Sequence, residues 1–520
     1  MDADRLGREF LVFAMHAHSD PNLSPRDALK IDALKSSDAL RAALAKAGYV
    51  EERLAATIGL SHPGETLDLA LAVRRVASSE PYDVLVRLFL LGRLVAETDA
   101  ATAVAPVPLT ELFECGLLRR EDGAVRSAVK LLPYADLMCV SDFGRTEVER
   151  DLPLDHVLGV GPASVTVAKL TVPRLGGEIL DLGCGAGIQS LLAGPTARRV
   201  VGTDTNPRAL NMAGFNAGLN GVGHIEWRQG SFFEPVAGET FDGIVANPPF
   251  VISPRGKYLF CDSELTGDGV SEHVLRHSSA HLREGGYATV LFNWHYEGGE
   301  DWERRPFEWC AGNGCDCWLV RSGDAEPLTY AANWLRQGEG RDPQRFARML
   351  DEWLEYYARL GIQRLCSGAM VMRKRIGGNN WRRTDSMEVG NAVGACGAHI
   401  ERFFALETVF HEEGDAGLLR RAWRVHGDTE LTQELTWDGD GWVLRGVHVR
   451  LQAGLPFAGS GDHALVRLLG GCRGDRPLDA LVRELATELG TSYDAIVPSV
   501  LAVVRKLVRA GILTLAGVPA

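Results

Sequence analysis

Hydrophobic residues recur with two different periods along the chain, and the change of period divides it into segments. In residues 1–60 the apolar positions have helical spacing, as in SSDALRAALAKAGYVEERLAATI. Residues 65–150 continue with apolar helices, followed by a turn at residues 121–123 between alternating strands. Helices followed by a small hairpin predict a helical, winged-helix-like N-terminal module over residues 1–150.

Short apolar strands alternate with helical stretches from Gly177 to about Arg375. This alternation is typical of βαβ units around a parallel sheet. The strand candidates are EILDLG, RVVGTD, HIEWRQG, FDGIVANPP, YATVLFNW and LCSGAMVMRK. We therefore predict an α/β domain over residues 155–375.

The last part of the chain predicts a small α+β C-terminal module. Residues 376–455 are rich in glycine, tryptophan and charge. Their segment WRVHGDTELTQELTWDGDGWVLRGVHVRL predicts a β-rich region with antiparallel strands around a turn at residues 438–441. Residues 456–520 predict three helices and a closing strand, a second helical, winged-helix-like unit.

Composition and charge narrow the classes of function. The 520 residues are 46% hydrophobic and 24% charged, which is ordinary for a globular protein. The formal net charge is −13, whereas proteins that bind phosphate backbones usually present a basic surface. Stable DNA binding is therefore not expected, although a local basic patch would still allow an RNA substrate.

The sequence predicts a cytoplasmic protein without a membrane span. No apolar run reaches the roughly 20 residues of such a span, and the first residues lack a secretory signal. The ten cysteines show no disulfide-like rhythm, which indicates reduced thiols. Cys310, Cys315 and Cys317 lie close together, but zinc sites usually have four ligands in paired spacing. We expect a loop there and no bound metal.

A glycine-rich loop follows the first predicted strand of the α/β domain. The strand EILDLGCGAG ends at Asp181 and turns through Gly183, Gly185 and Gly187 into a helix. Glycines allow positive φ and close approach of a ligand, at the strand end where open α/β sheets bind ligands. Asp181 would repel a pyrophosphate and suits a cofactor with a cationic amino group and a sulfonium. Asp204 ends the second strand, where a carboxylate accepts both ribose hydroxyls.

A second motif, Asn247-Pro248-Pro249-Phe250, follows the fourth predicted strand. The Asn247 side-chain oxygen and the Pro248 carbonyl are acceptors for the two N–H hydrogens of a planar amide or base. They would stabilise positive charge on that nitrogen as it attacks a methyl group, while Phe250 stacks on the planar group. The alternative is a rigid corner between strand and loop, stiffened by the two prolines.

Together these motifs resemble those of the class I S-adenosylmethionine-dependent methyltransferases. The Asn-Pro-Pro-Phe motif is similar to that of release-factor glutamine methyltransferases and of ribosomal RNA guanine-N2 methyltransferases, in the "methyltransferase small" type of domain. The resemblance implies a Rossmann-like seven-stranded domain and S-adenosyl-L-methionine as cofactor. It implies that the three glycines and Asp204 hold the cofactor, that Phe232 packs on adenine, and that Asn247 borders the cofactor as well as the substrate. Ser231 stands where many members have an acid.

Several other residues are weaker candidates. His273, His277 and His281 recur on one helix face, which favours local packing over a metal or acid-base role. Trp294 and His295 end the fifth strand, where they would border a substrate pocket. Residues 159–164, GVGPAS, would cover the cofactor.

The leading hypothesis is an enzyme that methylates a planar amide or exocyclic nitrogen, with a protein side chain as the favoured substrate. The flanking modules would select that protein or an RNA substrate. The alternatives are methylation of a ribosomal or transfer RNA base, methylation of a small natural product, and a non-catalytic regulator that binds S-adenosylmethionine and carries winged-helix modules. A regulator has no need of Asn247–Phe250, so this motif favours catalysis. The oligomeric state stays open.

Overall fold

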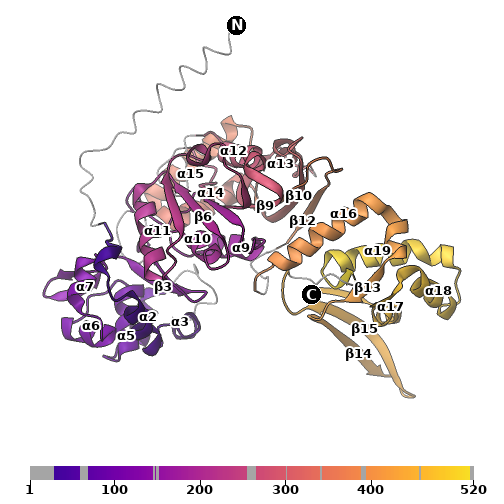
Figure 1. The fold of residues 1–520 in the computed structure, drawn as a ribbon, viewed down its shortest axis with the longest axis horizontal. Helices are drawn as coiled ribbons and strands as arrows, with labels where there is room; N and C mark the ends of the chain where they lie inside the picture. Colours follow the sequence, from indigo (N-terminus) through magenta and orange to yellow (C-terminus); the bar gives the residue numbers. More distant parts are fainter. Residues whose placement is uncertain are drawn as a thin grey trace, which may run out of the picture.

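The computed structural model describes residues 28–58, 68–144, 147, 152–254, 265–299, 301–339, 342–387, 394–455 and 458–515. Figure 1 shows a helical N-terminal part, a central sheet with helices, and a C-terminal part of helices and a long hairpin. Residues 1–27 of the predicted N-terminal module lie outside the described residues. Among the helices described, none is both long and apolar enough to cross a membrane.

The N-terminal part contains short helices followed by two β-hairpins. Its helices are η1 (Ile31–Ala33), α2 (Ser37–Lys46), α3 (Glu51–Ile58), α4 (Leu69–Arg75), α5 (Pro81–Leu85), η2 (Val86–Leu90), α6 (Glu97–Val104) and α7 (Leu109–Glu114). The hairpins are β1 (Leu118–Glu121) with β2 (Ala124–Ser127), and β3 (Lys130–Tyr134) with β4 (Leu137–Ser141). Asp122 and Gly123 form the first turn with φ of 51° and 76°, as a tight two-residue turn requires. The winged-helix assignment stays a prediction.

The central part is built on one sheet of eight strands in the order β12-β10-β11-β9-β8-β5-β6-β7. The strands are β5 (Glu178–Leu182), β6 (Arg199–Asp204), β7 (Ile225–Gln229), β8 (Phe241–Ala246), β9 (Leu282–Tyr296), β10 (Cys315–Ala325), β11 (Arg364–Lys374) and β12 (Arg382–Ser386). Strands β5 to β9 are parallel, and β11 is antiparallel to both of its neighbours. The predicted α/β class is confirmed, with β12 as an eighth strand beyond the seven expected.

Helices cover both faces of this sheet. They are α9 (Pro162–Leu170), α10 (Ile188–Ala193), α11 (Pro207–Leu219), η3 (Glu234–Val236), α12 (Gly269–Ser278), η4 (Ser279–His281), α13 (Arg304–Trp309), α14 (Pro327–Glu339) and α15 (Pro343–Arg359). Helices α12 and α13 pack on one face, and α9 packs on the other. The prediction of a loop around Cys315 and Cys317 is wrong, because both residues lie at the start of strand β10 and are buried.

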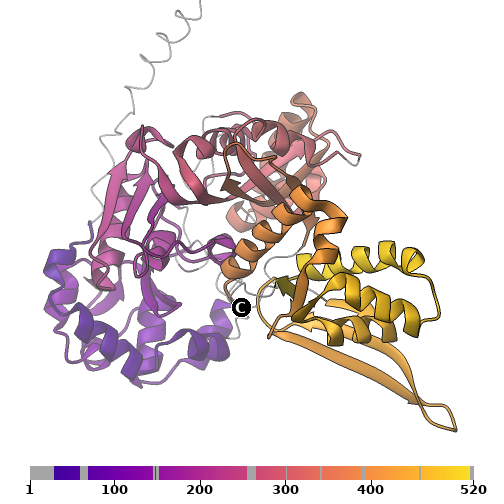
Figure 2. The same cartoon turned by 45° about the vertical axis from the view of Figure 1, so that its right-hand side comes forward.

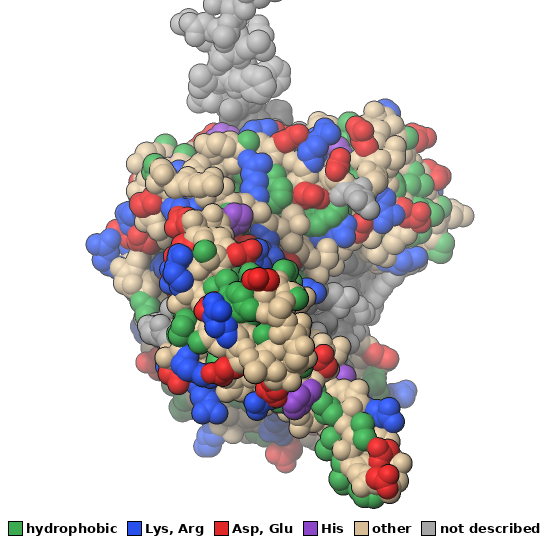
Figure 3. Space-filling model, turned by 90° about the vertical axis from the view of Figure 1, so that its right-hand side faces the viewer, with side chains coloured by type: hydrophobic (Ala, Val, Ile, Leu, Met, Phe, Trp, Pro, Cys, Tyr) green, Lys and Arg blue, Asp and Glu red, His purple; other side chains and the backbone are tan. Residues whose placement is uncertain are grey.

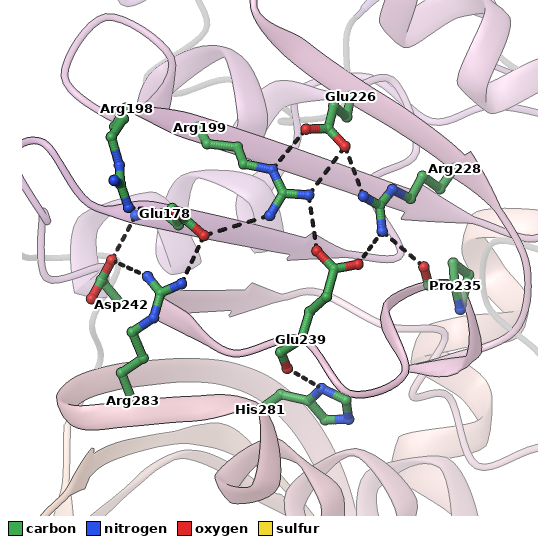
Figure 4. A network of polar contacts seen from close by, with 10 residues as sticks. All are labelled: Glu178, Arg198, Arg199, Glu226, Arg228, Pro235, Glu239, Asp242, His281 and Arg283. Carbon is green, nitrogen blue, oxygen red and sulfur yellow. Dashed lines mark hydrogen bonds and ion pairs between the residues drawn. The ribbon is translucent and has the colours of Figure 1, made fainter.

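Charged residues link the amino ends of the parallel strands, as Figure 4 shows. Arg199 at the start of β6 donates to Glu226 of β7 at 2.7 Å. Arg283 of β9 donates to Glu178 of β5 at 2.8 Å and to Asp242 of β8 at 2.7 Å. The hydrogen bonds from Arg199 are the main reason that the pKa of Glu226 falls to about 2. Charge pairing thus occupies the edge of the sheet opposite to the predicted cofactor loop.

The C-terminal part has one core rather than the two predicted regions divided at residue 455. Its elements are α16 (Gly397–Arg420), β13 (Ala422–Val425), β14 (Thr429–Trp437), β15 (Trp442–Leu451), β16 (Ala458–Gly461), α17 (His463–Gly471), β17 (Arg473–Pro477), α18 (Leu478–Glu488), α19 (Tyr493–Arg509) and β18 (Leu513–Leu515). Trp423 and Val449 share a core with Leu468 and Val504. The predicted three helices and closing strand of residues 456–520 are present as α17, α18, α19 and β18.

Helix α16 joins the central and C-terminal parts and lies in a region that the sequence predicted to be β-rich. Ile400, Phe403 and Phe404 in its first half pack on the central sheet. Phe410 in its second half packs in the C-terminal core, and the helix kinks at Gly414 (φ 60°, ψ −156°). Two different surfaces therefore bury its apolar residues, which is why they do not form the single stripe that indicates a helix. Figure 2 shows the long β14–β15 hairpin projecting beyond this part.

Candidate active site

The two sequence motifs lie side by side at the carboxyl end of the sheet. Strands β5 and β8 are parallel neighbours, and Leu182 of β5 is paired with Ala246 of β8. The residues that follow them, Gly183 and Asn247, therefore lie at the same edge of the sheet. A Cβ atom placed on Gly183 would lie 3.9 Å from the Cα atom of Pro248. The structure brings the glycine loop and Asn247–Phe250 together.

The glycine loop needs glycine for two different reasons. Gly183, Gly185 and Gly187 all have positive φ, of 71°, 53° and 82°. A Cβ atom on Gly187 would lie 2.9 Å from Ala213 and Trp227, so close packing excludes a side chain there. A Cβ atom on Gly185 would meet nothing within 4 Å, which leaves its backbone open to a ligand.

Asp204 is held in place by the backbone of the same loop. Its carboxylate accepts hydrogen bonds from the Gly185 N–H and the Asn206 N–H, each at 2.8 Å. Burial raises the pKa of Asp204, and these backbone hydrogen bonds oppose the rise. The side chain is thus fixed at the end of β6 beside the loop, where the predicted contact with the ribose would be made.

Asp181 lies behind the loop rather than on its surface. It is 2% exposed and accepts hydrogen bonds from the backbone N–H and the hydroxyl of Ser190, at 2.9 and 2.7 Å. Burial raises its pKa to about 6, and the nearby charge of Asp204 adds to the rise. Asp181 therefore fixes the start of helix α10, and its predicted contact with the cofactor stays a prediction.

Ser231 and Phe232 follow β7 on the other side of Asp204. Phe232 has a φ of 47°, a strained conformation for a residue with a large side chain. Its ring lies 4.3 Å from that of His273, measured between centroids, and Phe233 stacks on His281 at 4.6 Å. His277 in turn packs on His273, with ring centroids 4.3 Å apart, so all three histidines are used in local packing. The described residues contain no group of three His, Cys, Asp or Glu side chains that could hold a metal ion.

The Asn247 side chain has a buried acceptor without a partner. Its Oδ1 atom is buried and accepts no hydrogen bond from the residues that the structure describes. Buried side-chain oxygens are nearly always hydrogen-bonded, so this atom is available to accept a hydrogen bond from a water molecule or a ligand. Pro248 is buried beside it, and Phe250 is partly buried against the core that includes Val245 and Tyr287.

A buried group of hydrogen bonds holds the chain just after Phe250, which the sequence did not predict. The Ile252 N–H donates to the Tyr330 hydroxyl at 3.1 Å, and the Tyr357 hydroxyl donates to the Ile252 carbonyl at 2.7 Å. The Asn293 amide also donates to Tyr330, at 2.7 Å. The tyrosines come from α14 and α15, far from Ile252 in sequence, so no local motif indicates the contact.

The weaker candidates have mixed outcomes. Trp294 is 0% exposed and its Nε1–H donates to the Trp302 carbonyl at 2.7 Å. The prediction that it borders a pocket is wrong, because its side chain packs in the core under α12 and α13. His295 remains partly exposed, 3.6 Å from the Asp268 carboxylate. Ser164 of the segment 159–164 accepts a hydrogen bond from Gln189 at 2.9 Å, so this segment lies against helix α10.

Both motifs fall within residues 162–301, which match the family model described as methyltransferase small domain. This segment is a class I S-adenosylmethionine-dependent methyltransferase domain. Two flanking stretches match models described as domains of unknown function, DUF7059 over residues 65–128 and DUF7782 over residues 401–515. The second of these spans residue 455, in agreement with the single C-terminal core.

The methyltransferase domain is similar to two kinds of named relative. It is 36% identical over 130 residues to the release factor glutamine methyltransferase of Xylella fastidiosa, covering 22% of this chain and 47% of the relative. It is 29% identical over 135 residues to a putative protein N5-glutamine methyltransferase of Methanocaldococcus jannaschii, covering 25% and 68%. The chain therefore spans about half the length of the first of these relatives.

A solved structure, PKMT2 from Rickettsia typhi in complex with AdoHcy, is also similar. It is 12% identical, with a TM-score of 0.30, and the match covers 69% of this chain and 75% of that one.

Proposed function

We propose that this protein transfers a methyl group from S-adenosylmethionine to the planar nitrogen of a side-chain amide in a protein substrate. The observation that carries the proposal is the buried, unpartnered Oδ1 atom of Asn247 next to the glycine loop. Bound S-adenosylmethionine supplies an electrophilic methyl group on a sulfonium. Gly183, Gly185 and Asp204 would hold it, and Phe232, next to Ser231, would pack on the adenine as the resemblance implies. Asp181, behind the loop, would supply negative charge near the cationic groups of the cofactor.

The residues at the end of β8 suit a primary amide as methyl acceptor. An amide nitrogen is a poor nucleophile because its lone pair is delocalised, and it carries two N–H donors. The Asn247 Oδ1 atom would accept one of them and the Pro248 carbonyl the other. Positive charge grows on the nitrogen as its lone pair localises, and two fixed acceptors in a buried site stabilise that charge. Phe250 would contact the flat face of the amide and set its angle.

The relatives, the net charge and the flanking parts indicate the class of substrate. The two named relatives carry protein glutamine methylation in their names. The net charge of −13 also favours a protein over an RNA backbone. The flanking parts, residues 28–144 and 394–515, would select the substrate, because their length exceeds what a small molecule requires. An RNA base is the alternative acceptor with the same pair of N–H donors.

Two substitutions separate the acceptor site from the cofactor site. Asn247→Ala should lower turnover by about a hundredfold, the typical effect of removing one fixed group that stabilises a transition state. It should leave the dissociation constant for S-adenosylmethionine nearly unchanged. Asp204→Ala should instead raise that constant, because it removes the carboxylate beside Gly185. Turnover would be measured as transfer of tritium from labelled cofactor to protein, RNA and small-molecule fractions of a lysate.

Each outcome has a definite meaning. Label in the protein fraction supports the proposed substrate class, and label in the RNA fraction overturns it. If no fraction gains label although the cofactor binds, the protein is a regulator rather than an enzyme. If Asn247→Ala turns over like the wild type, the proposed role of its amide is wrong.

A further inference from the structure

The β14–β15 hairpin has one apolar face that continues beyond the core it covers. Val447 and Val449 near its base are 0% and 1% exposed and lie in the C-terminal part, where β15 contacts helix α17. On the same face nearer the tip, Leu435, Trp437 and Trp442 are 51%, 55% and 68% exposed. Figure 3 shows hydrophobic side chains along the projecting hairpin, with acidic side chains near its end. A clustered, exposed apolar face of this kind indicates an interaction surface.

Strand β14 also has a free edge. The small sheet has the order β14-β15-β16, so only one edge of β14 is paired among the strands described. The hairpin contains a bulge, whose extra residue is Arg445 of β15. Strand β14 itself therefore keeps a regular alternation, with Leu431 and Leu435 on the apolar face and Glu430 and Glu434 on the polar face. A regular free edge can pair with another strand.

We propose that β14 pairs antiparallel with β14 of a second copy of this chain, with Gln433 opposite itself. In this register Leu431 lies opposite Leu435 of the second copy, on the apolar face. On the polar face Glu430 lies opposite Thr436, and Glu434 lies opposite Thr432. If the centre of the pairing moves from Gln433 to residue 432, Glu430 lies opposite Glu434 of the second copy. If it moves to residue 434, Glu434 lies opposite itself. Like charges that face each other destabilise a sheet.

The same register accounts for the exposed end of the hairpin. An antiparallel pair places the tip of each hairpin beside the base of the other, with Trp437 opposite Thr429 of the second copy. The apolar face at that base is the one covered by the helices of the C-terminal part. Leu435 and Trp437 would thus gain apolar neighbours that their own copy does not supply. The two-fold symmetry makes every such contact occur twice.

Charge substitution tests both the dimer and its register. Sedimentation equilibrium of the full chain should show a dimer for the wild type. Leu435→Glu and Leu431→Lys should each give a monomer, because each puts a charge opposite a leucine. The double variant should again be a dimer, since the lysine introduced at position 431 of one copy then lies opposite the glutamate introduced at position 435 of the other. Leu489→Glu, at a leucine that is 48% exposed outside the hairpin, should remain a dimer.

The single variants change exposed side chains, so unchanged circular dichroism and cofactor binding would show that they fold. A monomeric wild type overturns the proposal and leaves the hairpin to a different partner. A dimeric wild type whose single variants dissociate, but whose double variant does not reassociate, overturns the register. If both single variants stay dimeric, the interface lies elsewhere. None of these results depends on methyl transfer, so the proposed function is tested separately.

Discussion

Asp181 and Asp204 place one buried and one partly buried carboxylate around the glycine loop, and burial disfavours the charged form of both. Asp181 has a pKa raised to about 6, and the pKa of Asp204 is raised as well. Between about pH 4, the usual pKa of an aspartate in the unfolded chain, and about pH 6, the folded state binds more protons than the unfolded state. The free energy of unfolding therefore falls as the pH rises through this range. A cationic ligand in the loop would reverse this preference, because it stabilises the ionised carboxylates.

We therefore expect the affinity for S-adenosylmethionine to rise between about pH 5 and pH 7, as Asp181 loses its proton. Binding near pH 6 should release a proton, which calorimetry in buffers of different ionisation enthalpy would measure. Asp181→Asn removes the titrating group and should abolish most of this pH dependence. An equal dependence in wild type and variant would show that Asp181 does not respond to the cofactor charge.

At the scale of elements, the helical pair α14–α15 determines the path of the chain after the Asn-Pro-Pro-Phe motif. Both backbone groups of Ile252 are bound by hydroxyls from this pair, and Ile252 is 0% exposed. Burial raises the pKa of Tyr357, which keeps its hydroxyl protonated as a donor. The pair thus holds the backbone at Ile252, two residues after the motif ends at Phe250.

Tyr357→Phe should lower turnover while leaving the dissociation constant for the cofactor unchanged. The substitution leaves the buried Ile252 carbonyl without its donor, which costs about 1–3 kcal/mol of stability. Turnover and cofactor binding would be measured on the same preparation. Tyr493→Phe is a matched control, because it removes a hydroxyl bonded to Asp479 in the distant C-terminal part. Equal turnover of both variants and the wild type would show that Ile252 does not position the motif.

The sequence predicts those elements whose signals are local. The glycine loop and Asn247–Phe250 are each contiguous, and the alternation of strands and helices places both at one sheet edge. Strand β12 has the polar sequence RRTDS, and it belongs to the sheet only because β10 provides an edge for it. The sequence does not predict the tyrosines that bind Ile252 either, since they lie 78 and 105 residues from it. Long-range contacts of this kind leave no periodicity in the chain.

At the scale of the whole molecule, helix α11 connects the N-terminal part to the methyltransferase domain through its asparagines. The Asn216 amide accepts from the Val140 N–H at 2.7 Å and donates to the Val140 carbonyl at 2.9 Å. Asn220 makes the same pair of bonds with Met138, each at 2.8 Å. These side chains complete the edge of β4 as a neighbouring strand would. The same helix begins directly after Asn206, whose N–H donates to Asp204 of the proposed cofactor site.

This connection predicts that the N-terminal part and the methyltransferase domain unfold together. Asn216 is 0% exposed and also donates to the Ala186 carbonyl at 2.9 Å. Asn216→Ala leaves the Val140 N–H and these carbonyls buried without partners, at about 1–3 kcal/mol for each group. The denaturant midpoint should fall, and amide exchange at Val140 should accelerate. The fall should be smaller for Asn211→Ala, whose hydrogen bond with the Leu29 N–H is only partly buried. If Val140 exchanges at the wild-type rate in the Asn216 variant, the strand edge is stabilised by apolar packing alone, and the asparagines do not couple the two parts.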